Sequence, residues 1–168
     1  MAYEKHQQSA NDIRARCAVI TLSDTRTEAT DKGGARIKQL LVEQGHEVVE
    51  YQIIPDDPAK FELLLETFLV RADIDAVVTT GGTGLSRRDQ TIDVVQRIIE
   101  QPIPGFGELF RMLSYEQIGS GALLSRAMAG VSRGKLIFAL PGSVKAIELA
   151  MSKLILPEIR HILFELRK

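Results

Sequence analysis

The stretch "DAVVTTGGTGLSRRDQT", residues 75–91, decides the fold and focuses the search for function. An apolar run rich in β-branched residues ends abruptly in the glycine-rich segment GGTG (81–84), and a charged cluster, RRD (87–89), follows it. A run without polar alternation is typical of a strand covered on both faces. The glycines indicate that the backbone turns sharply where the strand ends.

Three further runs have the same strand-like character: "CAVITL" (17–22), "EVVEYQII" (47–54) and "KLIFAL" (135–140). Apolar stripes with helical spacing lie between and after them, at 35–44, 59–72, 103–118, 147–155 and from Pro157 onward. Strands that alternate with helices predict a three-layer α/β fold, a mostly parallel sheet with helices on both faces. We expect a single domain over 16–168, preceded over 1–15 by a mobile arm or a partner-contacting tail.

Composition excludes several classes of protein. A hydrophobic content of 45%, a charged content of 26% and a net charge of −1 are ordinary for a soluble globular domain and indicate no nucleic-acid or membrane partner. The single cysteine, Cys17, cannot form an intrachain disulfide and is interpreted as a small buried apolar residue. The N-terminus has no signal-peptide pattern, so we expect a cytoplasmic protein.

Polar residues follow every predicted strand. The four strands are followed by SDT (23–25), PDD (55–57), GGTG (81–84) and PGS (141–143). The carboxyl ends of parallel strands lie along one edge of a sheet, which is where ligands bind in this class of fold. The sequence therefore predicts that four separate segments meet in one crevice.

The GGTG segment has two interpretations. Backbone amides exposed in a glycine-rich loop before a helix can bind an anion, with Arg87 and Arg88 adding positive charge and Thr91 capping the helix that follows. The alternative is a tight strand-to-helix turn without a ligand. The segment is neither a Walker loop nor a GxGxxG fingerprint, so the pattern alone leaves both open.

Three aspartates, Asp24, Asp56 and Asp89, are predicted at the same edge. A lone aspartate after a strand is usually a turn former or a helix cap. Three of them beside an anion-binding loop indicate instead a divalent cation, with Mg²⁺ the default. No metal-ligand spacing joins the histidines, which are His6, His46 and His161.

The segment "TTGGTGLSRRDQT" (79–91) resembles the TTGGTG…RDxT signature of the molybdopterin adenylyltransferase family, the MogA and MoaB proteins. The resemblance runs from about Arg16 to the C-terminus. Its other motifs, in order, are "LSDTR" (22–26) with "TDKGG" (30–34), "IIPDD" (53–57), "GFGELFRMLSYEQIGSGALLSRAMAG" (105–130) and "FALPGSVKA" (138–146). The last two are most similar to the bacterial MoaB branch. Ile92 and Val144 stand where many MogA-type proteins have proline.

The resemblance implies a reaction in molybdenum cofactor biosynthesis: Mg²⁺-dependent transfer of AMP from ATP to the phosphate of molybdopterin, with release of pyrophosphate. Asp56 and Asp89 match the family's acidic positions for magnesium, nucleotide and catalysis. Residue chemistry alone gives the pair Ser125-Arg126 no role, but it matches the family's pterin-binding SR pair. The full set of positions that match substrate- or nucleotide-binding residues is Asp24, Gly81, Gly82, Thr83, Gly84, Arg88, Glu108, Ser125, Arg126, Pro141 and Gly142.

The resemblance also implies a homo-oligomer, a trimer or a dimer of trimers, with the N-terminal arm and the 103–118 helix as contact elements. Other molybdenum-cofactor synthesis proteins are possible partners. Two functions stay open at this point. Asp56, Asp89 and the GGTG segment favour the adenylyltransferase. Ile92 and Val144 are compatible with a carrier that binds or delivers the pterin without catalysing a reaction. A nucleotide-binding regulator of the same fold is a third, more generic reading.

Overall fold

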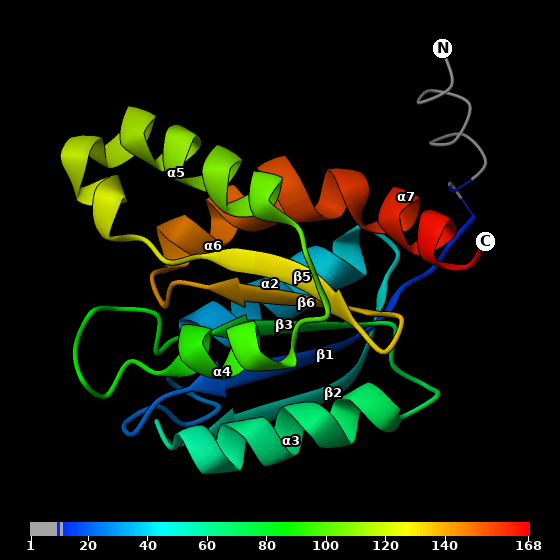
Figure 1. Ribbon diagram of the computed structural model, residues 1–168, viewed down its shortest axis with the longest axis horizontal. Coiled ribbons are helices and arrows are strands. Elements are labelled where there is room, and N and C mark those ends of the chain that lie inside the picture. Colours follow the sequence, from blue (N-terminus) through cyan, green and yellow to red (C-terminus); the bar gives the residue numbers. More distant parts are fainter. Residues whose placement is uncertain (1–9, 11) are drawn as a thin grey trace.

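A six-stranded mixed sheet forms the middle layer of the protein, which a computed structural model describes for Ala10 and residues 12–168 (Figure 1). The strand order is β2-β1-β3-β6-β5-β4. Strands β2, β1, β3 and β6 are parallel neighbours, and β5 and β4 extend the sheet in antiparallel fashion. The strands are β1 (Arg16–Leu22), β2 (Glu47–Ile54), β3 (Ala76–Thr80), β4 (Gln101–Pro102), β5 (Met128–Ser132) and β6 (Lys135–Leu140).

Helices cover both faces of the sheet, as the sequence predicts. One face carries α2 (Lys32–Glu43), α5 (Pro104–Ile118), α6 (Val144–Ala150) and α7 (Leu156–Leu166). The other face carries α3 (Pro58–Val70) and α4 (Thr91–Ile98). A short 3-10 helix, Gly119–Leu124, follows α5, and a π-helical turn, Met151–Ile155, joins α6 to α7.

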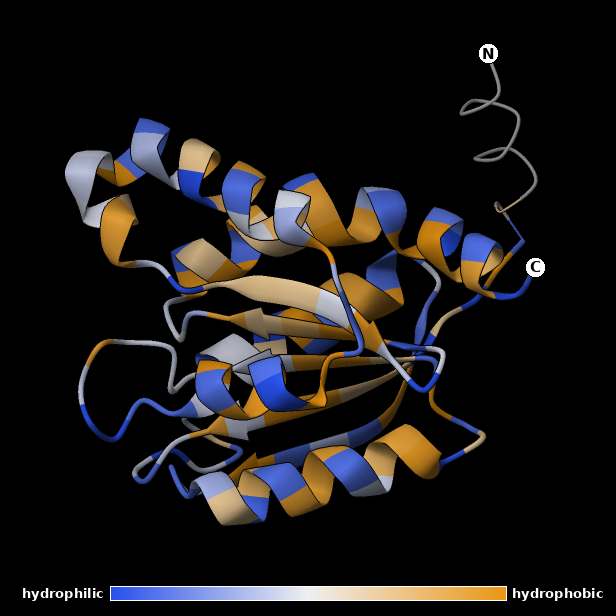
Figure 2. Cartoon of the chain, viewed as in Figure 1, coloured by the Kyte–Doolittle hydropathy of each residue, from blue (hydrophilic) through white to orange (hydrophobic). Residues whose placement is uncertain are grey.

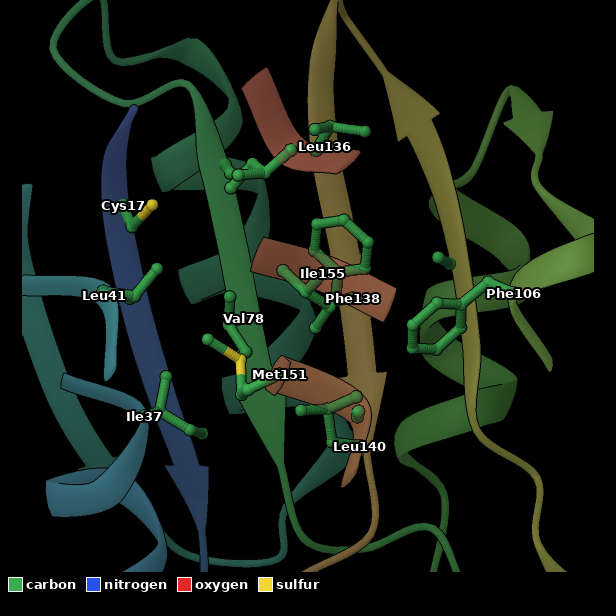
Figure 3. Close-up of a cluster of buried hydrophobic side chains, with 14 of the residues drawn as sticks. Cys17, Ile37, Leu41, Val78, Phe106, Leu136, Phe138, Leu140, Met151 and Ile155 are labelled. Carbon is green, nitrogen blue, oxygen red and sulfur yellow. The ribbon is translucent and has the colours of Figure 1, made fainter. Parts of the chain in front are cut away.

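The core is divided by the alternation of side chains along the strands. In β1, Cys17 and Val19 enter the cluster beneath α2, α5, α6 and α7, whereas Ala18 and Ile20 enter the cluster beneath α3 and α4. Figure 3 shows the larger cluster, in which Phe106 of α5 and the β6 residue Phe138 lie 5.5 Å apart between ring centroids. Burial on both faces explains why these strands lack polar alternation. It also raises the pKa of the Cys17 thiol to about 12, as expected of an inert buried cysteine.

The antiparallel strands β4 and β5 are not among the four strands predicted from the sequence. Strand β5 reads "MAGVS", whose small residues do not form a conspicuous apolar run. The turn that joins it to β6 places Arg133 and Gly134 at φ values of 50° and 71°, the left-handed region that tight hairpins require. The pairing Ser132 with Lys135 closes this two-residue turn.

The two helices predicted over 147–155 and from Pro157 form one uninterrupted helical run. The amide of Leu156 bonds the carbonyl oxygen of Met151, five residues back, in the π-helical turn. A wider turn relieves the clash that the proline ring makes with the preceding turn of an α-helix. The helix predicted from Pro157 is therefore confirmed as α7, which has this proline in its first turn and follows the π-helical turn without a break.

The arm predicted over 1–15 lies mostly outside the described residues. At its described end, Ala15 is buried, and its amide donates to Nδ1 of His46 at 3.1 Å. No helix in the described part of the chain combines the length and apolar character needed to cross a membrane.

His46 makes the stability of this corner dependent on pH. Burial, and then the charges of Arg160 and Arg14, lower the pKa of His46 from 6.5 to about 4. Between these two pKa values His46 is protonated in the unfolded chain and neutral in the folded chain. The free energy of unfolding therefore falls as the pH drops from 6.5 toward 4. At about 1.4 kcal/mol per pKa unit, the loss is on the order of 3 kcal/mol.

We expect His46→Asn, which keeps an acceptor for the Ala15 amide, to lose much less stability than the wild type between pH 7 and pH 4.5. Urea unfolding of both proteins at the two pH values measures this difference. Equal losses in the two proteins would contradict the role given to His46.

Candidate functional site

The loops after β1, β2, β3 and β6 meet at one edge of the sheet, on the left of Figure 1. The chain places β2 on one side of β1 and β3 on the other, so the loops after β1 and β3 leave toward opposite faces and open a crevice. Hydrogen bonds tie the loops together. Gly81 donates its amide to the carbonyl oxygen of Leu140 at 3.1 Å, and the Thr80 hydroxyl donates to that of Pro141 at 3.0 Å.

A buried carboxylate, Asp31, holds the first loop. Its oxygens accept from the hydroxyls of Thr21 and Tyr51 at 2.6 and 2.7 Å and from the amide of Gly34 at 3.0 Å. Burial alone would raise the pKa of Asp31, but these bonds, with the charge of Arg26, lower it. The Arg26 guanidinium reaches both Asp31, at 3.5 Å, and the carbonyl oxygen of Gly142, at 3.4 Å. Arg26, which also contacts Asp31, therefore connects the first loop to the PGS turn.

The three aspartates predicted at this edge do come together. Asp24 Oδ1 accepts the backbone amide of Asp56 at 3.1 Å, and its other oxygen lies 3.6 Å from Arg88. Burial, and then the charges of Asp24 and Asp89, raise the pKa of Asp56, while Arg88 opposes them. Oδ1 of Asp56 is buried without a hydrogen-bond partner, and a Cβ on Gly82 would lie 3.4 Å from it. The edge thus holds a carboxylate oxygen, beside the GGTG loop, that no group of the described chain satisfies.

Asp89 also shapes the loop that carries it. One of its oxygens accepts from the amide and the hydroxyl of Ser86 at 3.1 and 2.6 Å. Neighbouring Asp57, by contrast, caps α3 by accepting from two backbone amides, those of Ala59 and Lys60. The structure therefore assigns Asp57 to the ordinary capping role and leaves Asp24, Asp56 and Asp89 at the crevice.

The GGTG loop turns through Gly81 and Gly82, at φ values of 98° and 62°. The prediction that Thr91 caps the next helix is wrong. Gln90 occupies the cap position without a capping bond from its side chain, and Thr91 is the first residue of α4. The Thr91 hydroxyl instead donates to the carbonyl oxygen of Gly81 at 2.9 Å. It fixes the start of the loop to the helix.

Arg126 braces the other side of the same loop. Its Nη2 donates to the carbonyl oxygens of Gly84 and Asp89, both at 2.6 Å, and its Nε to that of Thr83 at 3.3 Å. Its Nη1 lies 3.5 Å from Asp93. Along the described chain, no hydrogen bond is donated by the backbone amides of Thr83 and Gly84. Arg126 thus collects the carbonyl groups of the loop and leaves those amides available to an anion.

A separate cleft of about 420 Å³ lies between α4, α5 and β5. Glu108, Ser125 and Arg126 line it, whereas Pro141 and Gly142 lie next to Gly81 at the crevice. The predicted site residues are therefore divided between an acidic crevice and a cleft, and the GGTG loop with Arg126 joins the two. Two residues differ from the proline of many related sequences: buried Ile92 lines the cleft, and Val144 lines a groove between α5 and α6. Neither difference removes a charged group from the site.

Several residues at these sites were not predicted from the sequence. They are Arg26, Asp31 and Tyr51 at the first loop, and Gln96 and Arg111 in the cleft. Asp31 and Arg26 lie in the quoted motifs "TDKGG" and "LSDTR", and Arg111 follows Glu108 by one helical turn. Helical spacing would have placed Arg111 on the face of Glu108, but only the fold shows that this face borders β5.

The described residues contain no group of three or more His, Cys, Asp or Glu side chains arranged to hold a metal ion. Mg²⁺ is often held by one or two carboxylates together with water and substrate phosphates. The unpartnered oxygen of Asp56, close to Asp24 and Asp89, fits such a partial ligand set.

Comparison with known proteins gives a consistent picture. Residues 18–161 match the family model described as "Probable molybdopterin binding domain". The chain is 47% identical to molybdenum cofactor biosynthesis protein B of Halalkalibacterium halodurans, over 100% of this chain and 99% of that protein. It is 46% identical to the protein of the same name from Bacillus subtilis, with the same coverage.

Solved structures agree. A crystal structure of a molybdenum cofactor biosynthesis protein B superposes with a TM-score of 0.90 at 49% identity, covering 92% of this chain and 97% of the other. The Pyrococcus furiosus protein MoaB, described as a tungsten cofactor synthesizing protein, gives 0.82 at 38% identity, covering 92% and 98%. A MogA structure gives 0.76 at 29% identity, covering 90% and 99%.

The charges around Asp56 give the first test of the crevice. Asp24→Asn removes a charge that raises the pKa of Asp56, while the new side-chain oxygen can still accept the Asp56 amide. We therefore expect the pKa of Asp56 to fall in this variant, as measured by NMR titration of its carboxyl carbon. Asp57→Asn, which alters a helix cap, is the control and should leave that pKa unchanged. An unchanged value in Asp24→Asn would mean that the two carboxylates do not interact.

Proposed function

Because the chain belongs to the molybdopterin-binding family of MogA and MoaB proteins of molybdenum cofactor biosynthesis, we propose that it adenylylates molybdopterin. In this reaction an oxygen of the molybdopterin phosphate attacks the α-phosphorus of ATP. The bond from that phosphorus to the β-phosphate oxygen breaks, and pyrophosphate leaves. The products are adenylyl-molybdopterin and pyrophosphate.

The unpartnered carboxylate oxygen of Asp56 beside the GGTG loop carries this proposal. Both reactants are anions, so the site must offset their repulsion and align them. The amides of Thr83 and Gly84 are placed to bind phosphate oxygens, and Arg88, whose side chain is 82% exposed, can turn toward them from Asp24. Asp56 and Asp89 would hold Mg²⁺, which supplies charge neutralisation when bound.

The cleft is assigned to the pterin. None of the three aspartates lines it, but Arg126, which does, bonds the GGTG loop, so a molecule seated in it can present its phosphate to a nucleotide at the crevice. Glu108 and Ser125 offer a carboxylate and a hydroxyl to the polar edges of a pterin. Arg126 acts from behind the loop, because it positions the carbonyl groups of Thr83 and Gly84.

The alternative is a carrier that binds molybdopterin without chemistry. Ile92 favours it, because this buried residue replaces the proline of many MogA-type proteins in the wall of the cleft. The two functions differ in their need for the acidic crevice. A carrier needs only the cleft, whereas the enzyme needs the crevice as well.

The deciding test is an anaerobic assay with the full chain, molybdopterin, ATP and Mg²⁺ that follows adenylyl-molybdopterin directly. We expect product from the wild type and a loss of at least about 100-fold in kcat for Asp89→Asn, because that change removes a charge from the crevice. Asn has the shape of Asp, so the loop built around Ser86 is retained. Asp57→Asn serves as the control and should be active.

Failure of the wild type to form product, with molybdopterin still bound tightly, would favour the carrier. Wild-type turnover in Asp89→Asn would remove Asp89 from the chemistry and leave the adenylyltransferase in place.

We also propose that the protein forms a homo-oligomer through α5 and the 3-10 helix that follows. Figure 2 shows hydrophobic residues along α5 and the 3-10 helix, which lie at the outside of the fold. The exposed large apolar side chains there are Leu109, Met112, Tyr115, Ile118, Leu123 and Leu124. Clustered apolar surface of this kind is typical of a protein–protein interface.

We expect Leu123→Asp, at a position 82% exposed, to shift the protein toward monomers in sedimentation equilibrium, because burying the new charge at an interface is costly. Leu63→Asp on α3, at a position 69% exposed, is the matched control and should assemble as the wild type does. A wild type that stays monomeric at every concentration would contradict the proposal.

A further inference from the structure

The cleft contains two arginines in opposite situations. Arg126 has most of its five N–H groups engaged by the carbonyl oxygens of the GGTG loop and by Asp93. A ligand in the cleft can recruit this guanidinium only by taking it away from the loop. Arg126 is therefore poorly suited to bind a substrate anion, although its position in the motif suggests that role.

Arg111 is the arginine of the cleft that has no such engagement. It is half-buried, and no hydrogen bond or ion pair joins its guanidinium to another described residue. Glu108 lies one turn earlier on α5 and also borders the cleft, yet the two side chains do not pair. Holding a partly desolvated cation without a counter-charge is unfavourable, and an incoming anion removes that penalty.

Local packing keeps Arg111 at the cleft. Gly107 lets α5 approach β5 closely, because a Cβ there would lie 2.7 Å from the carbonyl oxygen of Ala127. The same Cβ would lie 2.9 and 3.2 Å from Nη1 and Nη2 of Arg111. The arginine head thus lies back over Gly107, between the helix and the strand that form the cleft.

We infer that Arg111 is the side chain that binds the negatively charged group which the pterin substrate keeps in the cleft, apart from the phosphate that reacts at the crevice, while Arg126 is a positioning residue for the loop. This inference rests on the proposed function and adds the anion-binding residue of the pterin subsite. A guanidinium suits the task, because its planar set of N–H groups can bind two acceptor atoms at once and keeps its charge at every physiological pH.

The two roles predict different kinetic signatures. Arg111→Gln should weaken molybdopterin binding about 10- to 100-fold, with little change in kcat or in the KM for ATP, because it removes binding common to ground and transition states. Arg111→Lys, which keeps the charge but loses the paired geometry, should recover part of the affinity. Arg126→Gln should instead lower kcat and raise the KM for ATP, because the GGTG loop loses its brace.

The experiment is an anaerobic fluorescence titration of the full chain with molybdopterin, followed by steady-state kinetics for both substrates. Arg97→Gln is the matched control, since Arg97 pairs with Glu62 at 3.0 Å and does not line the cleft. Circular dichroism melts confirm that every variant is folded. Wild-type affinity in Arg111→Gln, combined with lost affinity in Arg126→Gln, would overturn the inference and leave the adenylyltransferase intact. A wild type that binds no molybdopterin would overturn both.

Discussion

Burial of β1, β3 and β6 on both faces constrains the rest of this structure. A parallel strand with apolar side chains on both sides needs a helix layer above and below, so each connection must cross from one edge of the sheet to the other. The chain satisfies this by placing α2 on one face and α3 on the other, which puts β2 and β3 on opposite sides of β1. The loops after β1 and β3 then diverge, and the crevice between them is a consequence of the topology rather than of any single residue.

Charged side chains give these loops their shape, and they do so by bonding to backbone and buried groups. Asp31 holds the first loop against β1 and β2, and Arg126 holds the GGTG loop and Asp89 through the carbonyl oxygens of Thr83, Gly84 and Asp89. Carbonyl groups facing a phosphate would repel it, so their collection around one guanidinium favours an anion on the side where the amides of Thr83 and Gly84 are free. The different roles of the two arginines in the cleft follow from the same bonds. Arg126 is bonded to the loop carbonyl groups and paired with Asp93, whereas Arg111 has no such bond among the described residues.

Much of the fold and the meeting of the strand ends could be predicted from sequence, because apolar runs and helical stripes report burial directly. Strand β5 could not, since the short segment "MAGVS" has no run of large apolar residues, and neither could the π-helical turn that joins α6 to α7 without a break. The site was harder for a related reason. Strand-end position predicted Asp24, Asp56 and Asp89, but the role of Thr91 was mistaken because its hydroxyl bonds to Gly81 across the loop. Whether an arginine is engaged or free is likewise a property of tertiary contacts.

The crevice itself argues for chemistry rather than storage. Asp56 is partly desolvated, faces the charges of Asp24 and Asp89, and has one oxygen that no group of the described chain satisfies. Each of these features disfavours its ionised form and so lowers the stability of the protein near neutral pH. A pterin carrier does not need them, since none of these three aspartates lines the cleft. A nucleotidyltransferase does, because these carboxylates would hold a divalent cation, which would offset both their mutual repulsion and the charge of the substrate phosphates. Unfavourable burial and repulsion of a carboxylate are expected at a functional site, where the binding of a cation and a polyphosphate offsets them.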